Sequence, residues 1–267
     1  MAMEDTAVEH FRDKGFVVLR GVHDEALLAS LRDTCDQVIA LAEANPSDLF
    51  TNYFLRHRPD QGVLYDLYQR YPQFAAFARS SRVVEAVRRI LGPNFFLYEN
   101  SLVFKPKGRD NAVPWHQDFM NREKEPPKVI AWMALDPISE QNGCMYAIPG
   151  SHRNGYLPWY KLRGQTHHTR VKPEHIKEQD AVPLEMNAGD VLLFHACLLH
   201  SSRQVATDRP RRAYRAAYQG FGRSAVPRGA PIVISLEDPS ALEAKHDYEP
   251  NRLKWFLHRV GKRLAEW

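Results

Sequence analysis

The chain has 267 residues, 44% of them hydrophobic and 25% charged, which predicts one folded domain with a substantial core rather than a disordered or fibrous protein. Its net charge of +4 comes from 36 basic and 32 acidic residues spread along the chain, which argues against a nucleic-acid-binding protein. No apolar segment is long enough to cross a membrane, and the 3 well-separated cysteines do not suggest a disulfide framework.

The first part of the sequence predicts helices with one intervening strand. We expect a short helix over residues 4–13, and because it is acidic and lacks an apolar run, it does not resemble a secretory signal. Together with reduced cysteines, this indicates a cytoplasmic protein. Gly15 separates this helix from the apolar run over residues 16–19, which predicts a strand. Asp24 is placed to cap a longer helix that Asn45 and Pro46 should end.

The next segment has a different composition. Residues 49–68 are irregular and rich in aromatic side chains, and they form either a lid over a pocket or a packed loop. A helix over residues 83–91 should end at Gly92 and Pro93. We therefore expect residues 1–92 to form an N-terminal helical layer that includes the candidate lid.

From residue 93 onward, short runs rich in β-branched and aromatic residues alternate with turn-forming residues. The expected strands cover residues 95–98, 101–104, 129–135, 144–148, 190–194, 200–205 and 211–218. Many short strands after a helical segment favour a mainly β fold with flanking helices, a double-stranded β-helix of the jelly-roll or cupin kind. We expect this core to span residues 93–222 of a single domain and to carry a polar surface insertion at residues 154–182.

The remaining residues, 223–267, are expected to form a C-terminal extension. Its last part, residues 250–267, has an apolar stripe at helical spacing with basic residues elsewhere. Such a helix either packs on the outside of the core with its charges in water or touches a membrane surface. The packed arrangement is the usual one in folded domains, so we predict no membrane partner.

The clearest indication of function is the stretch over residues 113–118, which contains His116 and Asp118. Residues two apart on an extended strand point to the same face, so an imidazole nitrogen and a carboxylate oxygen can reach one metal ion. We expect the third ligand to be His200, because polar residues follow it, whereas the alternative His195 lies in an apolar stretch typical of core. Two histidines and one carboxylate leave coordination positions free, as in non-haem Fe(II) enzymes that activate oxygen.

Arg211 is the candidate anchor for an acidic cosubstrate. If residues 205–210 contain the turn of a hairpin, Arg211 returns opposite His200 on the neighbouring strand. A guanidinium there can bind a carboxylate through two parallel hydrogen bonds. The alternatives, which we expect at the surface, are Arg209, Arg212 and Arg215. Arg215 is the strongest alternative anchor, because residues four apart on a strand point to the same face, as Arg211 and Arg215 would.

These motifs resemble the phytanoyl-CoA dioxygenase-like family of Fe(II)- and 2-oxoglutarate-dependent oxygenases. The resemblance extends to about Gly222 and also includes Gly15 to Leu19, Asn142 to Cys144, Ile148 to His152 and Gly189-Asp190. It implies iron bound by His116, Asp118 and His200, and 2-oxoglutarate bound by Arg211 with help from Ser202 and Trp132. Ser101 matches a further cosubstrate position, and the turn that contains His152 is structural in such enzymes.

The resemblance also implies a reaction. O2 would drive the oxidative decarboxylation of 2-oxoglutarate to succinate and CO2, coupled to hydroxylation of an unactivated C–H bond. Related halogenases leave the position of Asp118 open, so hydroxylation is expected over halogenation, although desaturation, epoxidation and ring closure use the same iron. Two other functions stay open: a cupin-like enzyme that uses these ligands for another metal, and a non-catalytic protein that binds metal or 2-oxoglutarate.

The sequence indicates only a broad substrate class. Polar, basic and aromatic residues near the expected mouth of the site favour a small molecule with an anionic group such as a carboxylate or phosphate. These residues are Arg56, His57, Arg58, Tyr65, Asn121, Arg122 and Lys124. A coenzyme A thioester and a natural-product intermediate are both compatible with this expectation, and the oligomeric state is left unpredicted.

Overall fold

The structure is a computed structural model that describes residues 2–44, 57–58, 62–105, 112–162, 169–205, 211–222 and 231–242. The α-helices in these ranges are α1 (Ala2–Lys14), α2 (Glu25–Ala44), α4 (Pro72–Ala78) and α5 (Ser81–Leu91). Short 3-10 helices are η1 (Met120–Arg122), η2 (Glu140–Asn142), η3 (Ser151–Asn154), η4 (Pro173–His175), η5 (Glu178–Asp180) and η6 (Pro239–Leu242). Over the same ranges, no helix has the length and apolar character needed to span a membrane.

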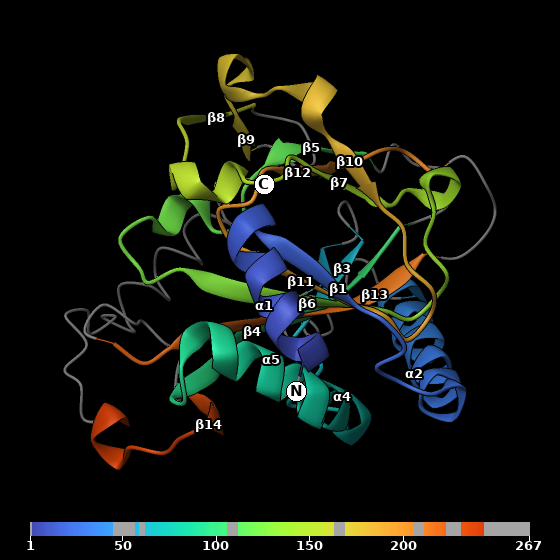
Figure 1. Cartoon of the computed structure of the whole chain (residues 1–267). Helices are drawn as coiled ribbons and strands as arrows, with labels where there is room; N and C mark the ends of the chain where they lie inside the picture. Colours follow the sequence, from blue (N-terminus) through green and yellow to red (C-terminus); the bar gives the residue numbers. More distant parts are fainter. Residues whose placement is uncertain are drawn as a thin grey trace, which may run out of the picture.

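The larger of two facing sheets has eight strands and crosses the middle of the molecule (Figure 1). Its order is β1–β11–β6–β13–β4–β3–β2, β14 also pairs with β4, and all pairs are antiparallel. The strands are β1 (Phe16–Leu19), β2 (His57–Arg58), β3 (Val63–Tyr65), β4 (Phe95–Phe104), β6 (Lys128–Ala134), β11 (Val191–His195), β13 (Arg212–Gly220) and β14 (Ile232–Ser235).

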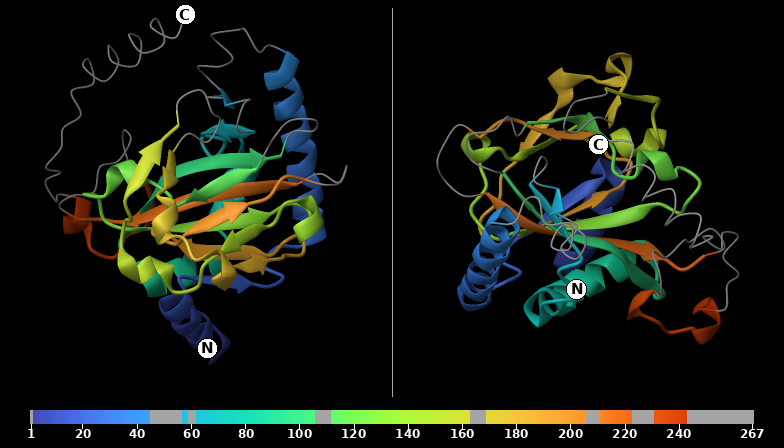
Figure 2. Two further views of the ribbon diagram at one scale, coloured as in Figure 1. Left: turned by 90° about the horizontal axis from the view of Figure 1, so that it is seen from above. Right: turned by 180° about the vertical axis from the view of Figure 1, so that it is seen from behind.

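The smaller sheet has four antiparallel strands in the order β10–β7–β12–β5 and lies above the larger sheet in Figure 1. Its strands are β5 (Val113–His116), β7 (Met145–Ala147), β10 (Val182–Leu184) and β12 (His200–Ser202). A two-stranded sheet of β8 (Trp159–Lys161) and β9 (Thr169–Val171) lies beyond the smaller sheet, as the view from behind in Figure 2 also shows. Two facing antiparallel sheets linked by crossing connections form the predicted jelly-roll core.

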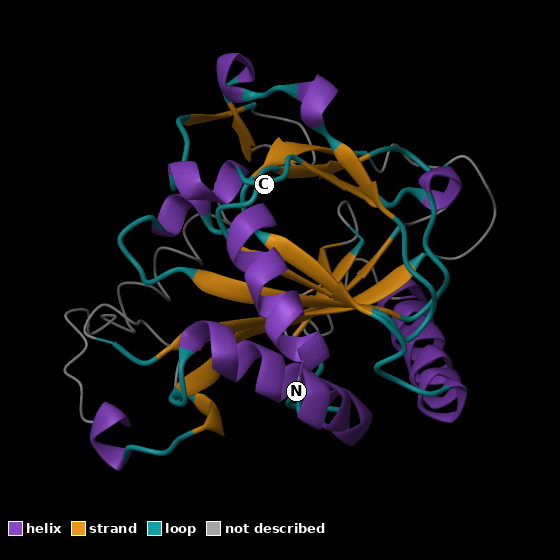
Figure 3. Cartoon of the chain, in the orientation of Figure 1, coloured by secondary structure: helices purple, strands orange, loops and turns teal. Residues whose placement is uncertain are grey.

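Alternating side chains build two cores on the two faces of the larger sheet. On β6, Ile130 and Trp132 pack in the cluster between the sheets, whereas Val129, Ala131 and Met133 belong to the cluster shared with the helices. Helices α4 and α5 lie below the larger sheet in Figure 3 and contribute buried side chains to this second cluster, as does α2. Both faces of β6 are therefore covered, which explains its continuous apolar sequence.

The helix boundaries follow the predicted local signals. Asp24 caps α2, because its Oδ1 accepts a hydrogen bond from the backbone N–H of Leu27 at 2.9 Å. The helix expected over residues 83–91 begins slightly earlier, at Ser81, and ends before Gly92, whose φ is 90°. Asn45 and Pro46, which were expected to end α2, lie outside the described residues.

Strand β4 differs from the prediction. The two runs expected as separate strands, residues 95–98 and 101–104, form one continuous strand with a bulge. Ala217 of β13 pairs with Glu99, whereas the next residue, Tyr218, pairs with Leu97. Tyr98 is thus the extra residue that bends the strand and changes which side chains face the smaller sheet.

Arg212 is buried, contrary to the expectation that it lies at the surface. The residue is 7% exposed, and its side chain extends from the start of β13 to α2. Its Nε and Nη2 donate to the carboxylate of Asp136 at 2.9 and 2.8 Å, and its Nη1 pairs with Asp36. Two carboxylates balance the charge of this buried guanidinium, so its role is structural. Arg209 lies outside the described residues.

The structure describes parts of the predicted insertion and of the candidate lid. The predicted insertion at residues 154–182 contains β8, β9 and two short 3-10 helices. Its Val171 packs in a small apolar cluster with Met120, Ile148 and Leu199, so it is more than a surface loop. Of the candidate lid at residues 49–68, β3 pairs with β4, while residues 49–56 and 59–61 are outside the described ranges, as is the tail over residues 250–267.

Candidate metal and cosubstrate site

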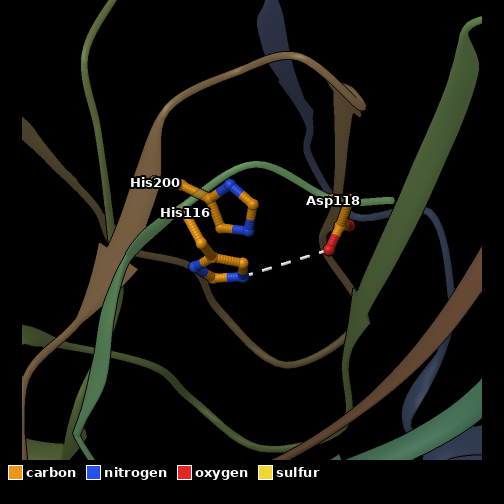
Figure 4. Close-up of side chains that lie close together, drawn as sticks. All are labelled: His116, Asp118 and His200. Carbon is orange, nitrogen blue, oxygen red and sulfur yellow. Dashed lines mark ion pairs between the residues drawn. The ribbon is translucent and has the colours of Figure 1, made fainter. Parts of the chain in front are cut away.

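The predicted metal ligands lie together between the two sheets. His116, Asp118 and His200 each offer one ligand atom within 4.8 Å of the others, and no second group of this kind occurs in the described part of the chain. His116 and His200 are paired in register on β5 and β12, with their ring centroids 4.1 Å apart. Figure 4 shows the carboxylate of Asp118 facing these imidazoles, and its Oδ1 lies 4.0 Å from Nε2 of His116.

Backbone carbonyls determine which nitrogen of each imidazole is available. Nδ1 of His116 lies 2.9 Å from the carbonyl oxygen of Pro114, and Nδ1 of His200 lies 2.9 Å from that of Leu198. A carbonyl oxygen only accepts hydrogen bonds, so both Nδ1 atoms carry the hydrogen. Both Nε2 atoms therefore keep a lone pair that can bind a metal ion.

The electrostatic environment favours the metal-binding protonation states. Burial, together with the nearby imidazole of His116, lowers the pKa of His200 to about 3, so His200 is neutral at pH 7. Burial alone would raise the pKa of Asp118, but the positive charge and hydrogen bond of Arg215, together with the neighbouring imidazoles, outweigh it, and the net shift is downward. A neutral imidazole and an ionised carboxylate are the forms that coordinate metals.

The chain path to Asp118 differs from the extended strand that was expected. β5 ends at His116, and Asp118 lies in a turn in which its backbone N–H donates to the carbonyl of Ala196 at 2.9 Å. Phe119 then adopts φ 60° and ψ 29°, a left-handed conformation that bulky residues rarely adopt. The expected strand geometry is wrong, although the carboxylate still reaches the imidazoles.

Gln117, between the two ligands, holds this turn in place. Its Nε2 donates to the carbonyls of Gly155 and Cys197 at 2.8 and 2.7 Å, and its Oε1 accepts from the backbone N–H of Leu157 at 2.8 Å. The side chain is buried, so these three bonds satisfy it fully on the side away from the metal ligands. Sequence reasoning assigned it no role, because its partners lie on segments that no local pattern connects to it.

Arg211 reaches the same site from the other sheet. It directly precedes β13 of the larger sheet, whereas His200 lies on β12 of the smaller one. The predicted hairpin between them is therefore wrong, because the two strands lie in different sheets, as successive strands of a jelly roll often do. Both residues nevertheless line one cavity of about 320 Å³ between the sheets.

The guanidinium of Arg211 is suited to bind an anion. The residue is 5% exposed, its Nε has no hydrogen-bond partner among the described residues, and its Cζ lies 4.5 Å from the centre of the Trp132 ring. Burial lowers the pKa of Arg211 to about 10, so the group stays charged at pH 7. A buried cation without a counter-charge is unfavourable, which indicates that an anionic ligand completes this part of the cavity.

The other predicted cosubstrate residues line the same cavity. Ser202 follows His200 on β12, and its buried Oγ also lacks a partner within the described ranges. Ser101 is buried on β4, where it pairs in register with Arg215 of β13. With Trp132, these residues, the metal ligands and Arg211 all line one cavity.

Comparison with known proteins now identifies the family. The family model described as phytanoyl-CoA dioxygenase (PhyH) matches residues 11–213. The chain belongs to the PhyH family. This span contains all the candidate metal ligands and Arg211, and it ends slightly before Gly222, to which the resemblance was expected to extend.

Individual relatives of this PhyH-family protein are distant. A phytanoyl-CoA dioxygenase of Arabidopsis thaliana is 25% identical over 242 residues, which cover 78% of this chain and 85% of the relative. The structure of ThoJ, a non-heme monooxygenase, matches with a TM-score of 0.71 at 20% identity and covers 97% of this chain and 96% of its own. The epimerase SnoN in complex with Fe3+, alpha ketoglutarate and nogalamycin RO matches with a TM-score of 0.62 at 19% identity, covering 94% and 97%. At these identities the solved structures establish the shared fold.

Arg215 of this PhyH-family protein was expected at the surface but lines the cavity. Its side chain is 12% exposed, and it donates to Glu99 Oε1 through Nη1 and to Asp118 Oδ2 through Nη2, both at 3.0 Å. Arg211 lies four residues earlier, just before β13, and both side chains line the cavity. Because Arg215 has two carboxylate partners, Arg211 is the better candidate for binding an external anion.

His195, the alternative third ligand, is not part of the cavity lining. Its Nδ1 accepts a hydrogen bond from the backbone N–H of Cys197 at 3.0 Å, and its ring lies 5.4 Å from that of His152. His152 in turn packs against Gly15, where φ is +83° and an added Cβ would lie 2.4 Å from the His152 ring. Both histidines pack the start of β1 against the core, so we interpret them as structural.

We expect His195 to contribute to acid destabilisation. Burial lowers the pKa of His195 from 6.5 to about 4, so the unfolded chain binds this proton more readily than the folded protein does. The free energy of unfolding should therefore fall as the pH decreases through this range. His195→Asn keeps an acceptor near the Nδ1 position but cannot titrate. Between pH 7 and pH 4, the thermal unfolding temperature should fall less for the variant than for the wild-type protein. An equal fall in both proteins would exclude a contribution from His195.

Proposed function

We propose that this protein is an Fe(II)- and 2-oxoglutarate-dependent dioxygenase that hydroxylates an unactivated C–H bond of a small molecule and releases succinate and CO2. One observation carries the proposal: two imidazoles and a carboxylate share a cavity with a buried guanidinium that lacks a carboxylate partner in the described structure. A dicarboxylate cosubstrate gives that guanidinium a partner. A hydrolase or isomerase that used the same ligands for zinc or manganese would not need the guanidinium of Arg211.

The chemistry of the donor set fits this cofactor pair. His116 and His200 would hold the iron through Nε2, and Asp118 would hold it through a carboxylate oxygen. Such a set of three ligands leaves coordination positions for the cosubstrate and oxygen. Arg211 would bind a carboxylate of 2-oxoglutarate, and Ser202 would add a hydrogen bond from its Oγ, because Nε of Arg211 and Oγ of Ser202 are buried without a partner among the described residues. The Trp132 ring packs against the guanidinium, and Ser101 of β4 lines the cavity where it could contact the cosubstrate.

The protein's own part in the reaction is to position groups and exclude water. When bound, iron and 2-oxoglutarate supply the oxidising power for C–H cleavage, with O2 as the oxidant. The apolar side chains of Met145, Phe194 and Phe119 line the cavity beside the metal ligands and keep water from the reacting carbon. Asp118 occupies a coordination position with a carboxylate, which supports hydroxylation rather than halogenation.

The substrate is proposed to be a small molecule with an anionic group. Of the residues expected near the mouth, Tyr65 and Asn121 line the cavity, whereas Arg122 pairs with Glu125 at 2.8 Å and Lys124 is exposed. Arg56 and the side chains of His57 and Arg58 lie outside the described part of the structure. Lys105 also lines the cavity, and its Nζ donates to the backbone carbonyl of Arg203 at 2.8 Å. Its positive charge supports an anionic substrate.

The test is substrate-stimulated turnover. Fe(II)-loaded protein is incubated with 2-oxoglutarate and a panel of carboxylates, phosphates, coenzyme A thioesters and natural-product intermediates, while succinate and oxygen are followed. We expect at least one compound to accelerate succinate release and to gain one oxygen atom per succinate. Binding of iron and 2-oxoglutarate without turnover across the panel would favour a non-catalytic binding protein. Activity that needs zinc or manganese and no 2-oxoglutarate would favour the cupin-like alternative.

A further inference from the structure

The two oxygens of Asp118 have different neighbours. Oδ1 lies 4.0 Å from Nε2 of His116, on the side of the candidate metal position. Oδ2 accepts a hydrogen bond from Nη2 of Arg215 at 3.0 Å. A carboxylate whose second oxygen is held by a guanidinium presents a single oxygen to a metal ion.

Glu99 fixes Arg215 from the other side. Nη1 of Arg215 donates to Glu99 Oε1 at 3.0 Å, and both side chains are largely buried. Glu99 reaches this position because of the bulge in β4, where Tyr98 is the extra residue. The guanidinium therefore bridges two carboxylates, and its planar shape sets the angle between the two hydrogen bonds.

Phe119 adds a further constraint directly after the ligand. The Cζ of Arg215 lies 5.0 Å from the centre of the Phe119 ring, and Nζ of the fully buried Lys128 lies 4.9 Å from it. Tyr98 packs edge-on against the same ring, with centroids 5.3 Å apart. These contacts oppose the tendency of Phe119 to leave its left-handed conformation, and so they hold the turn that presents Asp118.

We propose that Arg215 is a positioning residue that keeps Asp118 bound to the metal through one oxygen only. This inference rests on the proposed function, because it presumes a metal at His116, Asp118 and His200. If Oδ2 were free, the carboxylate could bind through both oxygens and occupy a position that the cosubstrate or oxygen needs. Arg215 thus preserves the open coordination positions on which the chemistry depends, without contacting the reacting atoms.

The first measurement is Co(II) binding to the metal-free protein, which needs neither substrate nor oxygen. For Arg215→Gln we expect Co(II) affinity to fall by about 10- to 100-fold, as for other groups that orient metal ligands. We also expect a changed visible Co(II) spectrum, because the spectrum depends on the number of coordinating atoms. Arg215→Lys keeps the charge but replaces the two terminal nitrogens that contact the two carboxylates with one, so it should restore the affinity only in part.

Two further variants serve as controls. Arg212→Lys changes the same residue type on the same strand, but on the opposite face, where Arg212 pairs with Asp136. It should lower the thermal unfolding temperature without changing Co(II) affinity or spectrum. Glu99→Gln leaves an oxygen that accepts from Arg215, so it should weaken Co(II) binding less than Arg215→Gln does. If Arg215→Gln does not fold, Arg215→Lys and Glu99→Gln decide the question.

The outcomes separate this inference from the proposed function. Wild-type protein that binds neither Co(II) nor Fe(II) would overturn the proposed function, and this inference with it. Wild-type protein that binds metal and turns over 2-oxoglutarate, together with Arg215 variants of unchanged Co(II) affinity and spectrum, would overturn the role of Arg215 alone. Weaker binding and an altered spectrum in Arg215→Gln, absent in Arg212→Lys, would support it.

Discussion

Asp118→Ala should reduce 2-oxoglutarate turnover by more than roughly 100-fold, because the loss of a ligand costs at least as much as the loss of a residue that only orients one. In the wild-type protein Oδ1 of Asp118 faces the two imidazoles. Without it, His116 and His200 alone would hold the iron, and two neutral ligands bind a divalent cation weakly. Initial rates of succinate formation and Fe(II) binding by titration check this expectation.

The control for this prediction is a matched pair of histidines. His200→Ala should lose metal binding as Asp118→Ala does, whereas His195→Asn should keep it, because His195 packs against His152 away from the cavity. Circular dichroism should show that all three variants are folded. Wild-type turnover in Asp118→Ala, or equal losses in the two histidine variants, would mean that the ligand assignment is wrong.

The candidate metal ligands could be proposed from sequence because few side chains bind iron and their spacing is informative. The proposal for His116 and Asp118 assumed a continuous strand, and the structure instead has a turn at Asp118. A turn stabilised by Gln117 brings the carboxylate to the same place. Residue type and spacing thus predicted the cluster, while the backbone path depended on contacts with segments far away in sequence.

The strands of the larger sheet were predictable for a different reason. Those covered on both faces, such as β6 and β11, have continuous apolar sequences that mark them as buried strands. The pairing of the strands was harder to predict from the sequence, because a hairpin and a connection between two sheets use similar turn residues. The hairpin expected between His200 and Arg211 is the clearest instance, since β12 and β13 lie in different sheets.

The arginines near β13 show where sequence patterns stop being informative. Strand parity correctly put Arg211 and Arg215 on one face. Whether a buried arginine is paired depends on carboxylates contributed by other elements, here Glu99 from β4 and Asp118 after β5. No periodicity within β13 reveals those partners, so Arg212 and Arg215 were both expected at the surface.

Arg211→Met should raise the KM for 2-oxoglutarate by about 100-fold. The methionine keeps apolar packing on Trp132 but removes the charge, and hydrogen bonds to a charged group contribute about 1.5 to 3 kcal/mol each. A net loss of about 3 kcal/mol corresponds to roughly 100-fold in affinity. At saturating 2-oxoglutarate much of the kcat should return, because Arg211 is not a metal ligand in this arrangement. Initial rates over a wide range of 2-oxoglutarate concentrations measure both quantities.

Two accompanying measurements distinguish anion binding from a structural role of Arg211. Co(II) affinity should be unchanged. Metal-free Arg211→Met should unfold at the same temperature as wild type or higher, since the substitution removes a buried cation that has no carboxylate partner among the described residues. Arg211→Lys should give an intermediate KM, because an ammonium lacks the planar pair of donors. An unchanged KM in Arg211→Met would show that Arg211 does not bind 2-oxoglutarate. The choice between a 2-oxoglutarate oxygenase and another metal enzyme on this fold would then depend on the identity of the metal alone.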